Sequence, residues 1–131
     1  MSNNMTWHCE LVIKNDADCA CDTECMTTHV MNHVYHDYAG RAYSDQRKAR
    51  IAVLSQFLRN YIEEITDAGN EYSGYNPMTH EIICGALQEI NFREIAETLI
   101  GDYSPKPAEE VAEREEYFNI RGFNNYDIDE D

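Results

Sequence analysis

Residues 45–66 read DQRKARIAVLSQFLRNYIEEIT and contain the most regular apolar pattern in the chain. The apolar side chains of this segment recur every three or four positions, which is the period of one face of an α-helix. They are Ile51, Leu54, Leu58, Tyr61, Ile62 and Ile65. Ser44 is a suitable N-cap, and Gly69 is a suitable residue to stop the helix. The segment predicts a long amphipathic helix.

Two further helices are expected C-terminal to this segment. The first starts at Pro77 and ends near Ile90, because the preceding asparagine is a good cap and proline favours the first helical position. The second follows Asn91, which matches a capping box together with Glu94, and it reaches about Tyr103. Almost no loop separates the two helices, so we expect a sharp turn between them.

Two more segments complete the helical prediction. Asp22 or Thr23 can cap a helix that reaches about Tyr38. A short acidic helix is expected over 108–118, after a linker, 104–107, that contains two prolines. We therefore expect a mainly α fold, a compact helical domain of four to five helices.

The N-terminal segment shows a different period. Its alternating side chains place Trp7, Cys9, Leu11 and Ile13 on one side of the chain. A period of two is typical of a β-strand. Because a lone strand is not stable, we expect a short N-terminal strand or extended arm. It would pack on the helices or pair with a second protomer in a homodimer.

Length and composition indicate one domain. The chain has 131 residues, of which 43% are hydrophobic, so a core can form. We assign residues 1–118 to this domain and expect the acidic residues 119–131 to be a flexible C-terminal tail. The sequence has no apolar run near the length of a membrane span. Its first residues lack a signal pattern, so we expect a location in the cytoplasm of a host cell.

The charge of the chain is negative and unevenly distributed. The net charge is −15, from 25 acidic and 10 basic residues. Residues 1–60 contain 7 acidic and 6 basic residues, whereas residues 61–131 contain 18 acidic and 4 basic residues. A surface of this kind attracts basic partners and repels nucleic acid. Excess carboxylates that only keep the protein in solution are the alternative explanation.

Five cysteines, an odd number, argue against a disulfide framework and for reduced thiols. Thiolates and imidazoles are the ligands that zinc prefers. Candidate zinc ligands are Cys19, Cys21, Cys25 and His29. His33 and His36 follow on the same face of the expected helix. The spacing matches no standard zinc module, so partly buried thiols and packed or solvated histidines remain the alternative.

We find no complete catalytic motif and expect no enzymatic activity. Pairs of neighbouring carboxylates, such as Glu63 and Glu64, point apart on a helix, which favours a solvated face over acid–base catalysis. A helical, dimeric DNA-binding regulator that uses the basic stretch 41–50 is a further alternative. Its weakness is that no cationic recognition helix follows residue 100.

Carboxylates on helices can imitate the phosphates of nucleic acid. DNA carries one charge per ~1.7 Å of axis, and a helix rises ~1.5 Å per residue. An acidic helix can thereby occupy the basic channel of a nuclease or polymerase. The candidate partner-binding residues are Glu63, Glu64, Asp67, Glu71, Glu89, Glu97, Glu109, Glu110, Glu113, Glu115 and Glu116.

Three features carry a resemblance to a known family. They are the N-terminal run from Met1 to Trp7, the Asn76-Pro77-Met78-Thr79 step before acidic helices, and the acidic C-terminal tail. The chain is similar in outline, over residues 44–131, to the Ocr-type DNA-mimic antirestriction proteins of podophages. The segment 91–99 also resembles a sequence motif that is common near the ends of uncharacterised phage proteins. The chain departs from that family by its lower acidity, its basic stretch and its cysteine-rich N-terminal part.

The resemblance implies a small phage-encoded inhibitor that counters a host defence, of the antirestriction or anti-CRISPR type. The expected partner is a host protein or ribonucleoprotein complex with a basic nucleic-acid-binding surface, and no direct contact with nucleic acid is expected. The alternative function is a zinc-stabilised adaptor or regulatory module that uses the N-terminal cysteines and histidines.

Overall fold

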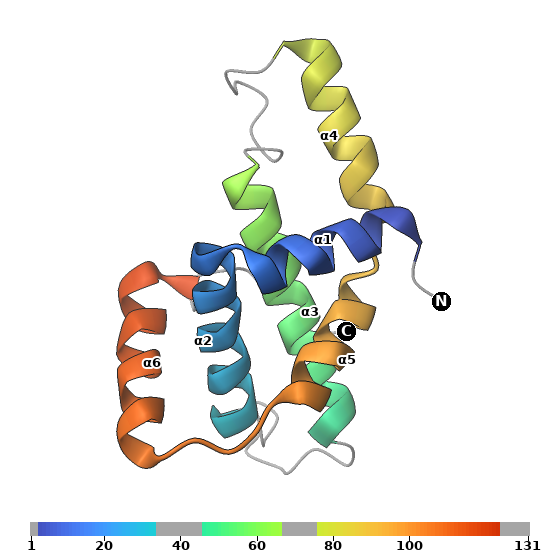
Figure 1. Ribbon diagram of the computed structural model, residues 1–131. Helices are drawn as coiled ribbons and strands as arrows, with labels where there is room; N and C mark the ends of the chain where they lie inside the picture. The colour runs from blue at the N-terminus through green and yellow to red at the C-terminus, as the bar shows by residue number, and fades with distance from the viewer. Residues whose placement is uncertain (1–2, 34–45, 67–75, 124–131) are drawn as a thin grey trace, which may run out of the picture.

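The computed structural model describes residues 3–33, 46–66 and 76–123 (Figure 1). Within these residues every regular element is an α-helix. The helices are α1 (Asn4–Asn15), α2 (Ala17–His33), α3 (Gln46–Ile65), α4 (Pro77–Glu89), α5 (Phe92–Asp102) and α6 (Ala108–Arg121). The prediction of a mainly helical fold is confirmed, with six helices in the described part of the chain instead of four to five.

The predicted N-terminal strand is wrong, because the same residues form α1. The side chain of Asn3 caps this helix by accepting a hydrogen bond from the Thr6 amide at 2.8 Å. Thr6 and Ile13 are buried, whereas Trp7 is exposed, so the buried positions follow a helical period and not an alternating one. The alternation of residues 7–13 is coincidental, and packing against the rest of the chain selected the helix.

Helix α2 begins at Ala17, five or six residues before its expected cap. The carboxylate of Asp16 accepts a hydrogen bond from the Cys19 amide at 3.0 Å and so takes the capping role. Asp22 and Thr23, the expected caps, instead lie buried within the helix. Its expected end near Tyr38 lies outside the described residues.

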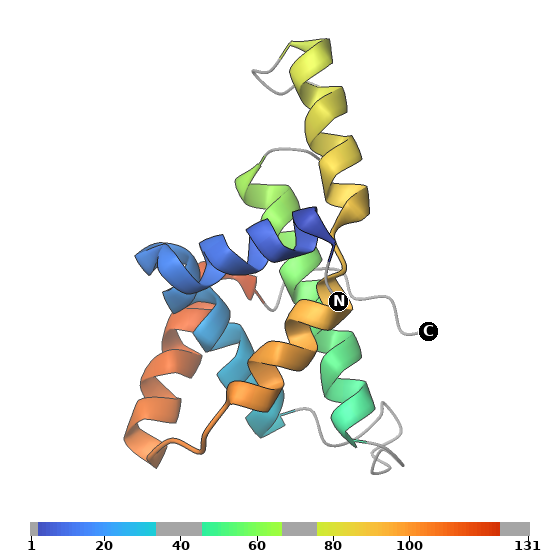
Figure 2. The same cartoon turned by 45° about the vertical axis from the view of Figure 1, so that its right-hand side comes forward.

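Helix α3 supplies the centre of the core, as its periodicity predicts. Leu54 and Leu58 are completely buried, and Ile51 is almost so. Figure 2 shows α3 crossing behind α1, with α5 beside it. The apolar face of α5 contributes Phe92, Ile95, Ala96 and Ile100 to the same core. Burial of these faces is the main source of the fold's stability.

Helix α6 packs along α2 and is longer than expected. It runs to Arg121, three residues past the predicted end at Phe118, and Gly122 ends it with φ 76°. A left-handed residue of this kind is a common helix stop. Phe123 follows and is buried against Phe118 and Tyr61. Residues 119–123 therefore belong to the packed domain, and the remaining part of the expected tail lies outside the described residues.

Helix α4 differs from the others because none of its residues is buried. The predicted N-caps of α4 and of the following helix α5 are both present. The side chain of Asn76 accepts a hydrogen bond from the Thr79 amide, and that of Asn91 accepts one from the Glu94 amide. In Figures 1 and 2, α4 projects from the body of the molecule, at the end opposite to α6.

Candidate functional site

The predicted partner-binding carboxylates that the structure describes are distributed over four helices. Glu63 and Glu64 lie at the end of α3, Glu89 at the end of α4 and Glu97 on α5. Five others lie on α6 and are Glu109, Glu110, Glu113, Glu115 and Glu116. Asp67 and Glu71 lie outside the described residues. Helix α6 thus holds the only cluster of these candidates in the described part of the chain.

Helix periodicity divides the α6 carboxylates into two sets. Glu109, Glu113 and Glu116 are exposed and follow each other at steps of four and three residues, which places them on one face. We call these three residues the outer row. Glu110 and Glu115 are half-buried. Glu115 lies 2.9 Å from His29 of α2, and Glu110 pairs with Arg114, which also contacts Glu24 of α2. Both glutamates therefore belong to the side of α6 that faces α2.

Arg114 connects the two helices at this interface. Its guanidinium donates to the hydroxyl of Thr28 at 3.1 Å and lies 3.0 Å from Glu110 and 3.5 Å from Glu24. Phe118 lies one turn further along and is completely buried, with its ring stacked on that of His29 at 4.1 Å. These contacts orient α6 so that the outer row points to solvent.

A buried carboxylate ties α2, α3 and α6 together. Asp22 is only 4% exposed and accepts hydrogen bonds from the phenols of Tyr61 and Tyr117, each at 2.6 Å. The guanidinium of Arg121 lies 3.6 Å from the same group. The hydrogen bond to Asp22 raises the pKa of Tyr117 to about 12. Burial, and then the bond to Asp22, raises the pKa of Tyr61 above its ordinary value. Both phenols therefore remain donors at neutral pH.

The predicted zinc ligands do not come together as a set. Among the described residues, the group of three donor side chains close enough to hold one ion is His29, His33 and Glu115, whose ligand atoms all lie within 4.8 Å of one another. His29 was predicted as a ligand. Cys19, Cys21 and Cys25 are absent from this group.

Three of the five thiols, those of Cys9, Cys19 and Cys25, have raised pKa values. Cys25 is buried, and burial raises its pKa to about 12. Burial likewise raises the pKa of Cys9 to about 11 and raises that of Cys19. Because the thiolate is the form that binds metal, these values favour packed, protonated thiols. All five cysteines are free.

The His29–His33–Glu115 group joins α2 to α6. Glu115 Oε1 lies 2.9 Å from His29 Nδ1 and 3.1 Å from His33 Nε2. The two histidines are one helical turn apart, and their rings stack at 4.9 Å. Their spacing in the sequence was visible, but the carboxylate comes from a residue 86 positions away. The sequence pattern contained no signal for that partner.

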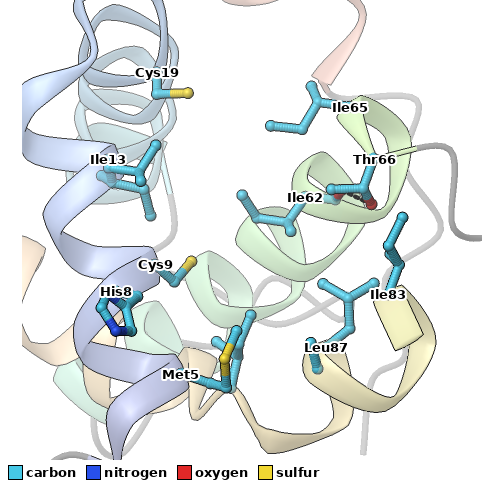
Figure 3. Close-up of a pocket in the computed structure, with 13 residues that line it drawn as sticks. Met5, His8, Cys9, Ile13, Cys19, Ile62, Ile65, Thr66, Ile83 and Leu87 are labelled. Carbon is cyan, nitrogen blue, oxygen red and sulfur yellow. Dashed lines mark hydrogen bonds between the residues drawn. The ribbon is translucent and has the colours of Figure 1, made fainter. Parts of the chain in front are cut away.

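An apolar pocket of about 330 Å³ lies between α1, α3 and α4 (Figure 3). Met5, Cys9 and Ile13 reach it from α1, and Ile62 and Ile65 reach it from α3. The α4 side chains that line it are Ile83, Ala86 and Leu87. Sequence reasoning missed this pocket because it treated the first of these segments as a strand. A helical period through Met5, Cys9 and Ile13 is the signal that could have indicated it.

No family model matches this chain, and neither a curated protein nor a solved structure matches it. In the part of the chain that the structure describes, no helix combines the length and the apolar character needed to cross a bilayer. The features of the described residues that indicate a function are the carboxylates of α6, the His29–His33–Glu115 group and the apolar pocket.

Proposed function

We propose that this chain is a phage-encoded inhibitor that binds a basic nucleic-acid-binding surface of a host nucleic-acid-handling or defence complex, and that α6 makes the contact. The observation that carries the proposal is the outer row of Glu109, Glu113 and Glu116, exposed on a helix whose opposite side is held by ion pairs and a buried phenylalanine. A rigid row of like charges loses little conformational entropy on binding, which favours affinity.

The spacing of the carboxylates in the outer row does not match the spacing of phosphates along a DNA strand. It therefore favours general charge complementarity over one-to-one mimicry of the phosphates. Steps of three and four residues separate the carboxylates by about 4.5–6 Å along the helix axis. Phosphates advance about 3.4 Å along one DNA strand. The row is therefore sparser than a DNA strand, and we expect it to block a basic channel locally by steric hindrance and ion pairing.

The test is a pull-down from a bacterial lysate at low salt, elution with duplex DNA, and mass spectrometry. Three chains are compared: the wild type, the triple variant E109Q/E113Q/E116Q, and the control triple variant D18N/E81Q/D102N, whose residues are not among the partner-binding candidates. The control removes the same charge from exposed positions on α2, α4 and α5. We expect DNA to release a nuclease, polymerase or defence complex from the wild type and the control, and the outer-row variant to capture none. Equal capture by the two triple variants would exclude α6 as the contact.

A zinc-stabilised module is the second candidate function, and the His29–His33–Glu115 group favours it. Two imidazoles and a carboxylate are a known zinc ligand set that leaves a fourth position open. Zinc binds these ligands at about 2.0–2.2 Å, so donor atoms that are now 2.9–3.1 Å apart need only small shifts to surround an ion. The metal would bridge α2 and α6.

Calorimetric titration with zinc, followed by thermal melting with and without chelator, tests this candidate. We expect about one zinc per chain, a higher melting temperature with zinc, and loss of both effects in H33A. The control C19S/C21S should bind zinc like the wild type. Zinc binding that survives H33A but disappears in C19S/C21S would restore the cysteine site and reject the histidine group.

A further inference from the structure

Helix α4 presents two large apolar side chains to solvent. Met78 is 71% exposed and Ile82 is 63% exposed, and no residue of this 13-residue helix is buried. Isolated helices of this length are marginally stable in water, and packing of an apolar face supplies most of the stability of protein helices. The apolar side chains on more than one face of α4 are therefore those of a helix that packs against a neighbour on more than one side.

The helix has two apolar faces with different surroundings. Ile83, Ala86 and Leu87 form the inner face and line the apolar pocket together with α1 and α3. Met78, Ile82 and Gly85 follow each other at steps of four and three residues and are all exposed. We call these three residues the α4 stripe. The inner face already has neighbours within the chain, and the stripe is the face that is left to an external partner.

Gly85 is a second indication that another surface approaches the stripe. A glycine within a helix lowers helix stability relative to alanine. A Cβ atom at this position would meet nothing within 4 Å, so the described contacts within the chain do not require glycine here. A neighbouring molecule packed closely on the α4 stripe would require it, because the missing side chain lets the two surfaces approach.

The rim of the pocket offers a matching surface on the same molecule. Val12 is 55% exposed and Ile65 is 48% exposed, and both also line the pocket. A protruding apolar stripe and an apolar hollow on one chain are self-complementary, because the stripe of one copy can fill the hollow of another.

The charge distribution favours a second copy at this place. A chain with a net charge of −15 repels its own copies wherever acidic faces meet. The α4 stripe itself is uncharged, and the exposed Glu81 and Glu89 border it one turn to either side of Gly85. Helix α6, which carries the outer row, lies at the opposite end of the molecule in both views (Figures 1 and 2). Contact through α4 keeps the two outer rows far apart and exposed, so the repulsion between these two rows is small in this arrangement.

The surface that such a dimer would bury is also large enough for a stable interface. A helix of 13 residues is about 20 Å long and about 10 Å wide, so covering half of it buries roughly 300 Å². In a two-fold arrangement each copy buries both a stripe and a hollow, and the total reaches roughly 1,200 Å², the lower limit for specific, stable interfaces.

We propose that the chain forms a two-fold homodimer in which the α4 stripe of each copy packs into the apolar pocket, and against the rim residues Val12 and Ile65, of the other. The dimer covers the exposed apolar surface of α4 and presents two outer rows on opposite ends. This inference does not depend on what the outer row binds.

Analytical ultracentrifugation over a wide concentration range, up to the high micromolar, tests the proposal on the full chain. We expect the wild type to sediment at twice the 15.2 kDa of the chain, and I82D to sediment as a monomer. The matched control is I120D, because Ile120 is an equally accessible isoleucine, 75% exposed, on α6. We expect I120D to remain dimeric. Circular dichroism of each variant checks that the helices persist.

The variant G85L is an independent test of the same interface. Gly85 is exposed, and a Cβ atom there would meet nothing within 4 Å, so this variant should keep its fold and show a weaker dimer. If the wild type is a monomer at every concentration, the proposal is overturned. This holds even if a different protein is found to cover α4. Dimers of I82D, or monomers of I120D, place the interface elsewhere and overturn it as well.

Discussion

At the scale of single residues, the most informative feature is the buried carboxylate of Asp22. Asp22 is enclosed with two phenols and a guanidinium, and each group has a partner of complementary character. A buried charge is tolerated only when it is paired and hydrogen-bonded. Sequence periodicity indicated the helix around Asp22 but assigned this residue to a cap, because tyrosine partners 39 and 95 positions away leave no local signal.

The buried thiols and Tyr117 make stability sensitive to alkaline pH. Each group has a pKa that is raised in the folded chain, to about 11 for Cys9 and about 12 for Cys25 and Tyr117, against ordinary values of 9.0 and 10.0. The folded chain keeps these protons at pH values where the unfolded chain loses them. Their contribution is therefore complete below pH 9 and is lost as pH rises towards 12.

We expect the urea midpoint to be nearly constant from pH 7 to pH 9 and to fall between pH 9 and pH 12. Urea unfolding at a series of pH values, under reducing conditions, measures this. In C25A the stability should be lower at every pH, because a small cavity forms, but its decline above pH 9 should be shallower. A C25A profile parallel to that of the wild type would show that Cys25 does not contribute to the decline.

At the scale of elements, the N-caps of α4 and α5 were predictable, whereas the N-cap of α2 and the whole of α1 were not. Asn76 and Asn91 cap α4 and α5 as expected, because a cap depends on the next three residues only. Helix α1 is held by long-range contacts instead. Its Thr6 is completely buried and accepts a hydrogen bond from the amide of Asn91 at 2.8 Å. A bond across 85 positions cannot be inferred from alternation within seven residues.

Replacing Thr6 with valine should therefore destabilise the chain although the shape of the side chain is kept. The variant T6V leaves the amide of Asn91 without its acceptor in a part-buried place. We expect a loss of about 1–3 kcal/mol in unfolding free energy, measured by urea denaturation. T6S, which keeps the hydroxyl and loses only a methyl group, is the control. If T6V and T6S were equally stable, the hydrogen bond would not anchor α1.

At the scale of the whole molecule, the net charge of −15 acts against compaction. The described ion pairs offset part of this repulsion, since Arg114 on α6 pairs with Glu110 and Glu24. The outer row has no such compensation built into its helical face, and it adds repulsion that salt can screen.

We expect the melting temperature of the wild type to rise as sodium chloride increases from low to physiological ionic strength. The rise should be smaller in E109Q/E113Q/E116Q, because three charges of the repulsive surface are absent. Calorimetry at several salt concentrations, at one fixed protein concentration, measures both. A melting temperature that falls with salt would show that attractive ion pairs outweigh the repulsion.

The sequence by itself determined the helical class, the long amphipathic α3, the starts of α4 and α5, and the concentration of negative charge after residue 60. These properties depend on neighbours within a few positions or on composition alone. The tertiary structure alone decided that α1 is a helix, that Glu115 rather than a cysteine joins His29, and that α6 divides its carboxylates into an inner and an outer set. Each of these outcomes depends on which segments pack together, and contacts across some 86 positions are set by burial and shape, which local patterns do not contain.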